Sequence, residues 1–239
     1  MSLNKRTIAR LAPLALLLTG VAFFLSWGSS PQAVAQSGVD DEQAGEVRAA
    51  NLIYGKNRTS VCFADQFLAE VEKETNIQTN RRFFPVQMSS DELFDYPFAV
   101  MTGEGNFSLT TQQRDTLKDY LQYGGFVIAS AGCSSKPWNQ SFKSEMDQMF
   151  PDAELIRLEA DHPIYHTVYD ITTSRYKSGA NKLPELHALE IDGRVVMVWS
   201  PDGLNDSSNA GPNCCCCGGN EVKSAKQLNV NILAYALTH

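Results

Sequence analysis

The residues best suited to chemistry in this sequence are a cysteine, a histidine and a glutamate. Cys133 follows an apolar run, Phe126 to Ala129, and precedes a helical pattern. α/β enzymes place nucleophiles on such strand-to-helix turns, and the start of the following helix would stabilise a thiolate there. With Asp161 to orient it, His162 would act as the base. These residues predict a cysteine-dependent hydrolase of amides or esters.

A structural interpretation of the same residues competes with this one. The loop around Cys133 lacks a Gly-x-Cys-x-Gly turn, and export would expose the thiol to oxidation. Pro163 moves His162 out of helical geometry, so its i,i+4 spacing with His166 does not predict a helical metal site. Cys133 would then be a structural or disulfide-bonded cysteine, and His162 a hydrogen-bonded loop residue.

Glu104 lies between two glycines after a second apolar run, Pro97 to Met101. A carboxylate there would serve as an acid or base, or would only occupy a surface turn. Thr102 and Gly103 complete this loop with small residues that let backbone N–H groups approach a ligand. We therefore expect Glu104 in a catalytic role and Thr102 and Gly103 in a binding role.

Two cations mark a further loop, at residues 55–60. Lys56 and Arg58 come before a helical pattern that Thr59 or Ser60 would cap. The N-terminus of a helix beside two cations would bind a carboxylate or phosphate. The alternative is a capped helix with two solvated charges. The spacing of a nucleotide-hydrolysing P-loop is absent from the sequence, so that activity is not predicted.

Four consecutive cysteines, residues 214–217, form the most unusual motif in the chain. Neighbouring Cα atoms lie ~3.8 Å apart, which is below the usual disulfide range, so adjacent cysteines bond only under strain. Cys214 and Cys217 have the C-x-x-C spacing of a local disulfide, a redox pair or a metal turn. Disulfides are the first interpretation. A metal held by Cys214 and Cys217, with zinc as the cofactor, is the second, and free thiols are the third.

Alternating strand and helix patterns must position these residues. Apolar runs predict strands at 47–54, 82–86, 97–101, 126–129, 186–191 and 195–199, and 3.6-residue periodicity predicts helices at 63–75, 111–123, 139–150 and 225–237. Asp192-Gly193 predicts a hairpin between the last two strands. The fold class is therefore α/β: a three-layer sandwich around a mostly parallel central sheet, with an antiparallel hairpin at one edge.

Three of the loops named above follow strands of this predicted sheet. They begin after residues 54, 101 and 129. Parallel strands end at the same edge of a sheet, and open α/β sheets bind their ligands at that edge. We therefore expect the three loops to meet there and form the site.

The first 35 residues have the pattern of a signal peptide. Lys5, Arg6 and Arg10 precede an apolar run, and Ala33-Val34-Ala35 is a small-x-small cleavage site. We expect cleavage after Ala35 and export to the periplasm or beyond, with an uncleaved membrane anchor as the alternative. Residues 36–46 are acidic and predict a flexible leader, and residues 47–239 form a single domain without a membrane span.

The charge of the chain excludes one class of partner. The net charge is −7, and the predicted signal peptide removes three basic residues and no acidic ones. Such an acidic protein has no electrostatic attraction for nucleic acid or for anionic lipid. We expect a small-molecule or protein partner instead.

Several motifs together resemble a bacterial protein family, domain of unknown function 4159. They include Tyr96-Pro97-Phe98, Asp161-His162-Pro163-Ile164-Tyr165 and Trp199-Ser200-Pro201-Asp202, and the resemblance extends over about residues 47 to 239. It implies a scaffold like that of class I glutamine amidotransferases and flavodoxins, in a protein that is exported or attached to a membrane, and it implies no activity. The prediction is therefore a non-catalytic binding or assembly module, with a cysteine-bound metal as an option and the cysteine hydrolase as the alternative.

Overall fold

The central strands form where apolar residues run without interruption. In the computed structural model, which describes residues 45–55, 63–206, 214 and 222–239, every residue of Phe98–Gly103 and of Phe126–Ala131 is buried. Strands covered on both faces have this pattern. These two segments are strands β3 and β4, and they lie at the centre of the sheet.

The remaining elements alternate as the periodicity predicts. The strands are β1 (Val47–Ile53), β2 (Thr79–Gln87), β3 (Phe98–Gly103), β4 (Phe126–Ala131), β5 (Ile156–Arg157), β6 (Ser174–Arg175), β7 (Asn181–Lys182), β8 (His187–Ile191) and β9 (Arg194–Ser200). The helices are α1 (Gln66–Glu74), α2 (Thr111–Gln122), α3 (Lys136–Met149) and α4 (Ala225–Thr238). Short 3₁₀ turns lie at Asp91–Asp95, Gly132–Ser134 and Pro163–Tyr165. The two-residue strands β5, β6 and β7 and these turns are absent from the prediction, because so short an element leaves no periodic pattern.

Seven strands form one mixed sheet in the order β2-β1-β3-β4-β9-β8-β5. β2, β1, β3, β4 and β9 are parallel, whereas β8 pairs antiparallel with β9 and β5 antiparallel with β8. At the β8–β9 turn both Asp192 and Gly193 have positive φ, as a tight hairpin of the predicted type requires. β6 and β7 form a separate two-stranded sheet. The predicted α/β class, with its antiparallel hairpin, is confirmed.

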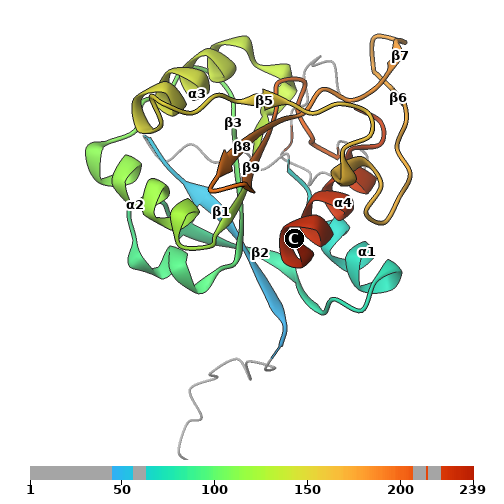
Figure 1. Cartoon of the computed structure of the whole chain (residues 1–239), viewed down its shortest axis with the longest axis horizontal. Helices are drawn as coiled ribbons and strands as arrows, with labels where there is room; N and C mark the ends of the chain where they lie inside the picture. The colour runs from blue at the N-terminus through green and yellow to red at the C-terminus, as the bar shows by residue number, and fades with distance from the viewer. Residues whose placement is uncertain (1–44, 56–62, 207–213, 215–221) are drawn as a thin grey trace, which may run out of the picture. The chain divides into compact units, whose positions relative to one another are not determined.

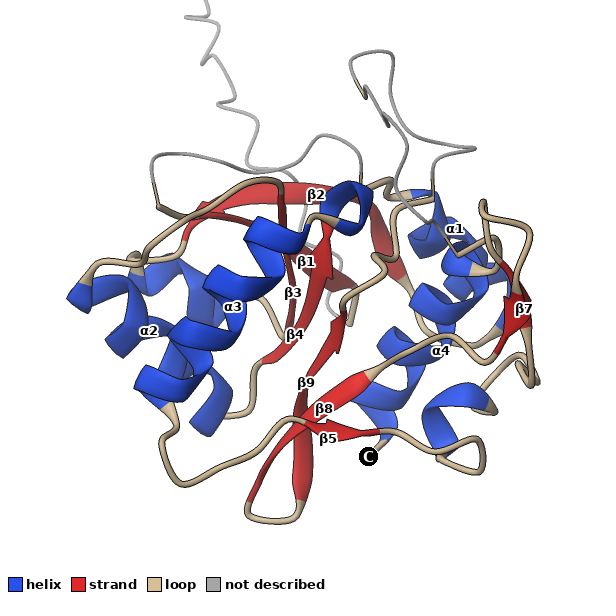
Figure 2. Cartoon of the chain, turned by 90° about the horizontal axis from the view of Figure 1, so that it is seen from above, coloured by secondary structure: helices blue, strands red, loops and turns tan. Residues whose placement is uncertain are grey.

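Helices cover both faces of the sheet (Figures 1 and 2). α2 and α3 pack on one face, over a core that includes Leu52, Met101 and Phe142. α1 and α4 pack on the other, over a core that includes Val100 and Ile128. Alternate residues along β3 and β4 belong to these two cores, because successive side chains of a strand point to opposite faces.

The helix ends agree with the predictions to within one residue, except at the starts of α1 and α3, and α3 begins at Lys136, three residues before the predicted Asn139. Thr110 caps α2 through a capping box with Gln113, as its sequence position suggests. α1 begins only at Gln66, after Asp65, so the predicted cap at Thr59 or Ser60 is wrong. Within the described part of the chain, none of the helices has the length and apolar character that a bilayer span requires.

Candidate functional site

The strand ends that the sequence analysis places together do meet. β1, β3 and β4 are neighbours in the sheet and run in the same direction, so the segments after residues 54, 103 and 131 leave the sheet at one edge. β9 is the next parallel strand and adds the segment after Ser200. We call this the carboxyl edge of the sheet. It is where open α/β sheets bind ligands.

Glu104 lies against the turn that carries Cys133. A β-carbon placed on Gly132 would lie 3.0 Å from Cγ of Glu104 and 3.0 Å from the carbonyl oxygen of Gly103. The amide of Gly105 in turn donates to Oγ of Ser135, at 3.1 Å. The loop after β3 and the turn after β4 are therefore in direct contact, and a glycine at position 132 makes this contact possible.

Cys133 itself has a backbone conformation that L-residues rarely adopt. Its φ and ψ are 51° and 33°, and the next residue, Ser134, has a φ of 53°. A left-handed conformation costs a non-glycine residue about 1–2 kcal/mol. The thiol is half-buried on a strand-to-helix turn, between β4 and α3, as predicted. Strain of this kind concentrates at functional sites.

The segment after β9 holds this turn from the other side. Oγ of Ser134 donates to the carbonyl oxygen of Asp202 at 2.7 Å, and Nδ2 of Asn139 donates to that of Pro201 at 2.8 Å. A β-carbon on Gly203 would lie only 2.2 Å from the carbonyl oxygen of Ala131. The backbones of the two segments therefore approach as closely as only glycine allows.

A buried hydrogen-bond chain supports the end of β3. Nε1 of Trp138 donates to the hydroxyl of Tyr54 at 2.6 Å, and that hydroxyl donates to the carbonyl oxygen of Thr102 at 2.9 Å. Burial raises the pKa of Tyr54, so the phenol keeps the proton that it donates. A β-carbon on Gly103 would lie 2.6 Å from the same hydroxyl oxygen. The chain fixes β1, β3 and α3 relative to one another.

Three hydroxyl residues form a row across the sheet at this edge. Thr102 pairs with Ser130 in the β3–β4 register, and Ser130 pairs with Ser200 in the β4–β9 register. Each lies two residues after a member of the core under α1 and α4, so all three side chains point to that face. All three residues are fully buried. Oγ of Ser130 accepts a hydrogen bond from the amide of Leu204, at 2.8 Å.

Two buried asparagines complete this region, which we call the polar layer: Thr102, Ser130, Ser200, Asn205 and Asn229. Nδ2 of Asn229, on α4, donates to the carbonyl oxygen of Leu204 at 3.1 Å. Asn205 is the next residue after Leu204 and is 2 % exposed. The polar layer therefore lies between the carboxyl edge of the sheet and the first turns of α4.

Most polar side-chain atoms of the layer lack a hydrogen-bond partner among the described residues. In the described part of the chain, five buried side-chain atoms of the layer have none: Oγ1 of Thr102, Oγ of Ser200, both polar atoms of Asn205 and Oδ1 of Asn229. Each such group costs about 1–3 kcal/mol, so five would together cost about as much as the whole stability of a domain, ~5–15 kcal/mol. Buried polar groups in native proteins normally have a hydrogen-bond partner, so this layer is the strongest candidate site in the described chain.

The structure does not bring His162 to Cys133. The ring of His162 packs on Tyr235, at 5.7 Å between centroids, and Tyr235 stacks on His239 at the end of α4. Burial lowers the pKa of His162, and Glu190 raises it in part. Glu190 pairs with the start of β9, so His162 lies at the amino edge of the sheet, opposite Cys133. The predicted dyad is therefore not formed.

The remaining predicted site residues are the two cations of the first loop and the cysteines of residues 214–217. Lys56, Arg58 and Cys217 lie outside the described residues, so their predicted roles stay predictions. Cys214 is disulfide-bonded, in agreement with the first interpretation of the cysteine run. A disulfide sulfur is not a thiolate, so Cys214 does not fit a zinc ligand in this state. Among the described residues, no group of three histidine, cysteine or carboxylate side chains has the geometry to hold a metal.

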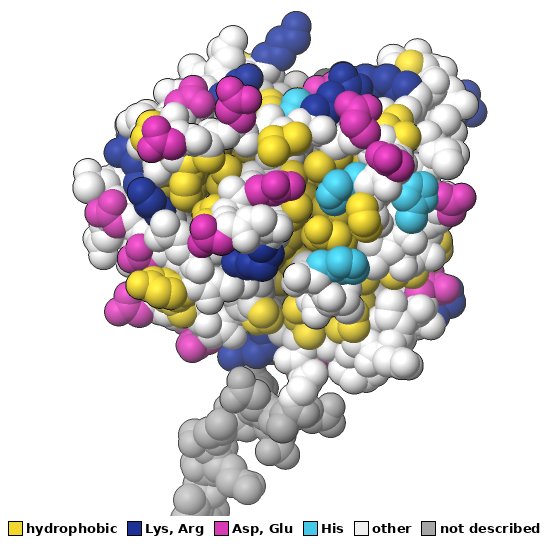
Figure 3. All heavy atoms as spheres, in the orientation of Figure 1, with side chains coloured by type: hydrophobic (Ala, Val, Ile, Leu, Met, Phe, Trp, Pro, Cys, Tyr) yellow, Lys and Arg dark blue, Asp and Glu magenta, His cyan; other side chains and the backbone are white. Residues whose placement is uncertain are grey.

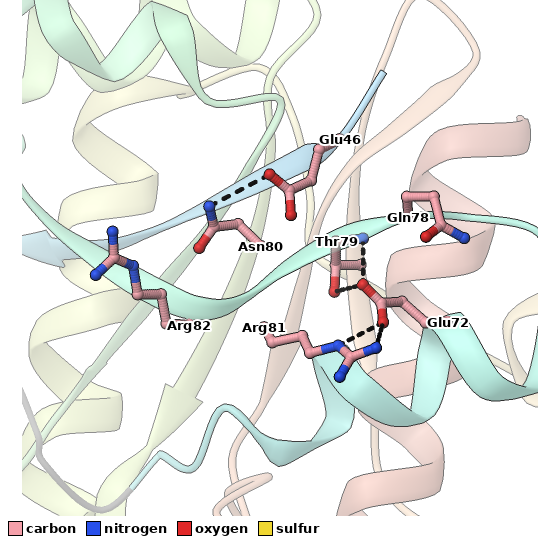
Figure 4. Close-up of a pocket in the computed structure, with 7 residues that line it drawn as sticks. All are labelled: Glu46, Glu72, Gln78, Thr79, Asn80, Arg81 and Arg82. Carbon is pink, nitrogen blue, oxygen red and sulfur yellow. Dashed lines mark hydrogen bonds and ion pairs between the residues drawn. The ribbon is translucent and has the colours of Figure 1, made fainter. Parts of the chain in front are cut away.

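A hollow of about 480 Å³ lies elsewhere, near the start of β2 (Figure 4). It is lined by Glu46, Glu72, Gln78, Thr79, Asn80, Arg81 and Arg82. Glu72 binds Arg81 at 2.5 Å and accepts from the amide of Thr79 at 2.9 Å, and the Arg81 guanidinium keeps the pKa of Glu72 below its usual range. Glu46 accepts from Asn80. Since these groups satisfy one another, the hollow is a weaker candidate than the carboxyl edge.

The outer surface gives no single-sign patch on the face drawn in Figure 3, where acidic and basic side chains are interspersed among hydrophobic ones. The candidate site is defined by its buried polar groups. Sequence reasoning found Thr102, Gly103, Glu104 and Cys133 at the carboxyl edge. It missed Ser200, Asn205 and Asn229, for which the only signal was their position at the end of β9, after β9 and on α4.

The model of the family described as "Domain of unknown function (DUF4159)" matches residues 48–237. This is nearly the whole of the range over which the motifs resemble that family. No curated protein matches the chain significantly.

Proposed function

The chain belongs to the DUF4159 family, and on that premise we propose that its domain is a binding module that takes a small ligand at the carboxyl edge of the sheet. One observation carries the proposal: the polar layer at this edge buries five polar atoms that have no partner in the described chain. A bound molecule would satisfy them. A scaffold of this kind does not by itself imply a reaction, and the likeness to glutamine amidotransferases stays a prediction.

The geometry of the loops supports binding over catalysis. Contacts among Gly132, Glu104, Ser134 and Asp202 hold the turns at the carboxyl edge in fixed positions. A fixed site loses little conformational entropy when a ligand binds. His162, the base of the predicted dyad, lies at the opposite edge of the sheet. We extend the proposal to the setting of the protein: an exported domain, released by cleavage after Ala35.

An NMR titration of the ¹⁵N-labelled full chain tests the proposal. The probes are glucose, N-acetylglucosamine, myo-inositol, glutamine and succinate. We expect at least one of them to shift the amides of residues 103–105, 132–134 and 202–205 together. If no probe shifts these amides, or if shifts occur only around residues 78–82 at the hollow of Figure 4, the carboxyl edge is not the binding site.

A second candidate function is cysteine-dependent hydrolysis. The left-handed backbone of Cys133 favours it, together with the carboxylate of Glu104 beside the preceding residue. Glu104 would then have to replace His162 as the base. Hydrolysis of p-nitrophenyl acetate by the wild type, Cys133→Ala and Glu104→Gln separates the two functions. The binding module predicts equal rates, whereas a hydrolase predicts a loss in both variants.

A further inference from the structure

We infer that the polar layer is a subsite for uncharged hydroxyl groups. When no ligand is bound, ordered water supplies these hydroxyl groups. When a ligand is bound, an uncharged polyol or saccharide supplies them. The second half of this inference rests on the proposed function. The first half, that the layer is occupied by hydroxyl groups, stands without it. Three properties of the polar layer support it: its occupancy, its charge and its spacing.

The first step is occupancy. Thr102 and Ser200 are fully buried, and their hydroxyls have no partner in the described chain. Both polar atoms of Asn205 also lack a partner in the described chain, and this residue is 2 % exposed. Leaving so many groups unsatisfied would cost a free energy comparable with the stability of the whole domain. Buried polar groups that the protein itself does not satisfy are normally bound to internal water.

The second step is charge. The side chains of the polar layer are hydroxyls and amides, none of which carries a charge. Among the described residues, the only buried acid or base is Glu145, and its partner is Arg114, at 2.6 Å. That pair joins α2 to α3, on the other face of the sheet. Burying an ion without an opposite charge is costly, so the guest of the polar layer is uncharged.

The third step is spacing. Thr102 and Ser200 flank Ser130 on the two neighbouring strands, so they lie two strand spacings apart, roughly 10 Å. One water molecule cannot bridge that distance, because each hydrogen bond spans about 2.8 Å. Oγ of Ser130, which lies between them, already accepts a hydrogen bond from the amide of Leu204. The layer therefore needs at least two hydroxyl groups, supplied by separate waters or by one molecule that bears several.

Whether the hydroxyl of Thr102 binds a guest is tested by the direction in which its removal changes the stability of the protein. Thr102→Val keeps the shape of the side chain and removes its hydroxyl. If the hydroxyl binds a guest, the variant loses that bond and unfolds at a lower urea concentration than the wild type. If the hydroxyl is unsatisfied, its removal leaves the urea midpoint unchanged or raises it, and the inference fails.

Thr79→Val is the matched control, because its hydroxyl is equally buried in a strand but donates to the carbonyl oxygen of Leu68, at 3.1 Å. Its urea midpoint must fall. Ser200→Ala repeats the test at the other end of the row. We expect all three variants to shift the midpoint downward. A fall confined to Thr79→Val would overturn the inference.

Water-to-amide NOEs on the full chain identify the source of the hydroxyls. In the wild type without ligand, we expect a long-lived water signal at the amides of Leu204 and Asn205, and its loss in Ser200→Ala. Addition of glucose or myo-inositol should displace the water signal, whereas gluconate and glucosamine, which carry a charge, should not.

The outcomes separate the inference from the proposed function. If the water signal persists with every sugar and polyol, the layer is an internal hydration site and the ligand part of the inference is wrong. If gluconate or glucosamine displaces the water, the proposed binding function survives but the uncharged class is wrong. If there is no water signal and Thr102→Val is stabilising, the polar layer is empty and the inference fails at its first step.

Discussion

The indole nitrogen of Trp138 donates to the hydroxyl of Tyr54 at 2.6 Å, and this single contact joins α3 to the end of β1. The same hydroxyl donates to the carbonyl oxygen of Thr102. Tyr54 is 1 % exposed, so water cannot replace either partner. One phenol therefore holds three segments of the carboxyl edge, and the position of Thr102 depends on it.

Tyr54→Phe should destabilise the protein by about 1–3 kcal/mol, because it leaves the buried N–H of Trp138 and the carbonyl of Thr102 without a partner. Urea unfolding measures the loss. Tyr123→Phe is the control, since Tyr123 is 81 % exposed and should tolerate the change. Equal stability of the two variants would contradict the assigned hydrogen-bond chain.

Gly203→Ala should be much more harmful than Gly193→Ala. Both glycines have positive φ, 86° and 76°, so both substitutions introduce backbone strain of about 1–2 kcal/mol. Only at Gly203 would the new β-carbon also meet backbone, at 2.2 Å from the carbonyl oxygen of Ala131, whereas at Gly193 nothing lies within 4 Å. Thermal unfolding should show the larger fall in Tm for Gly203→Ala, and similar values would mean that the segments after β4 and β9 are not in contact.

Low pH should weaken the contact between α1 and α4, because it protonates Glu70, which pairs with Lys226 of α4. Lys73, then Lys226 and the hydroxyl of Tyr169, hold the pKa of Glu70 at about 2. Since an unfolded glutamate has a pKa of about 4.3, this stabilisation is complete above that pH and is lost as the pH falls toward 2.

Urea midpoints at pH 7, 5 and 3 measure this effect in a Glu70→Gln variant. The variant should be less stable than the wild type at neutral pH, and the difference should shrink in acid. Glu74→Gln is the control, because Glu74 pairs with Lys73 on the surface, and such pairs contribute little. A difference that stays constant with pH would contradict the shifted pKa of Glu70.

The predicted signal peptide has a direct test in the mass of the secreted protein. Cleavage after Ala35 leaves Gln36 as the first residue. Intact-mass analysis of the periplasmic or extracellular fraction should find this species. Replacing Ala35 with a bulky residue, as in Ala35→Leu, should cause the uncleaved chain to accumulate in the membrane fraction. Full-length wild-type protein in the cytoplasm would contradict export.

The fold was predictable because its signals are local. Fully buried strands leave uninterrupted apolar runs such as Phe126 to Ala129, and Asp192-Gly193 specifies a hairpin turn. Knowing which strands end in loops was enough to place Glu104 and Cys133 at one edge. The start of α1 was not predictable from Thr59 and Ser60, because its N-cap residue Asp65 makes no side-chain capping bond.

The polar layer was not predictable, because it depends on long-range relationships. Thr102 and Ser200 share a row only through the strand register, and Asn229 reaches Leu204 only because of how α4 lies on the sheet. The pairing of His162 with Cys133 failed for a related reason. Nothing local to either residue shows that one lies at the amino edge and the other at the carboxyl edge.

A high-resolution crystal structure of the full chain would test whether the carboxyl edge binds uncharged hydroxyl groups. We expect electron density for at least two separate oxygen atoms within hydrogen-bond distance of Thr102 Oγ1, Ser200 Oγ and the Asn205 amide. An ordered polar layer without such density, its hydroxyls and amides bonded to one another or to backbone, would contradict it.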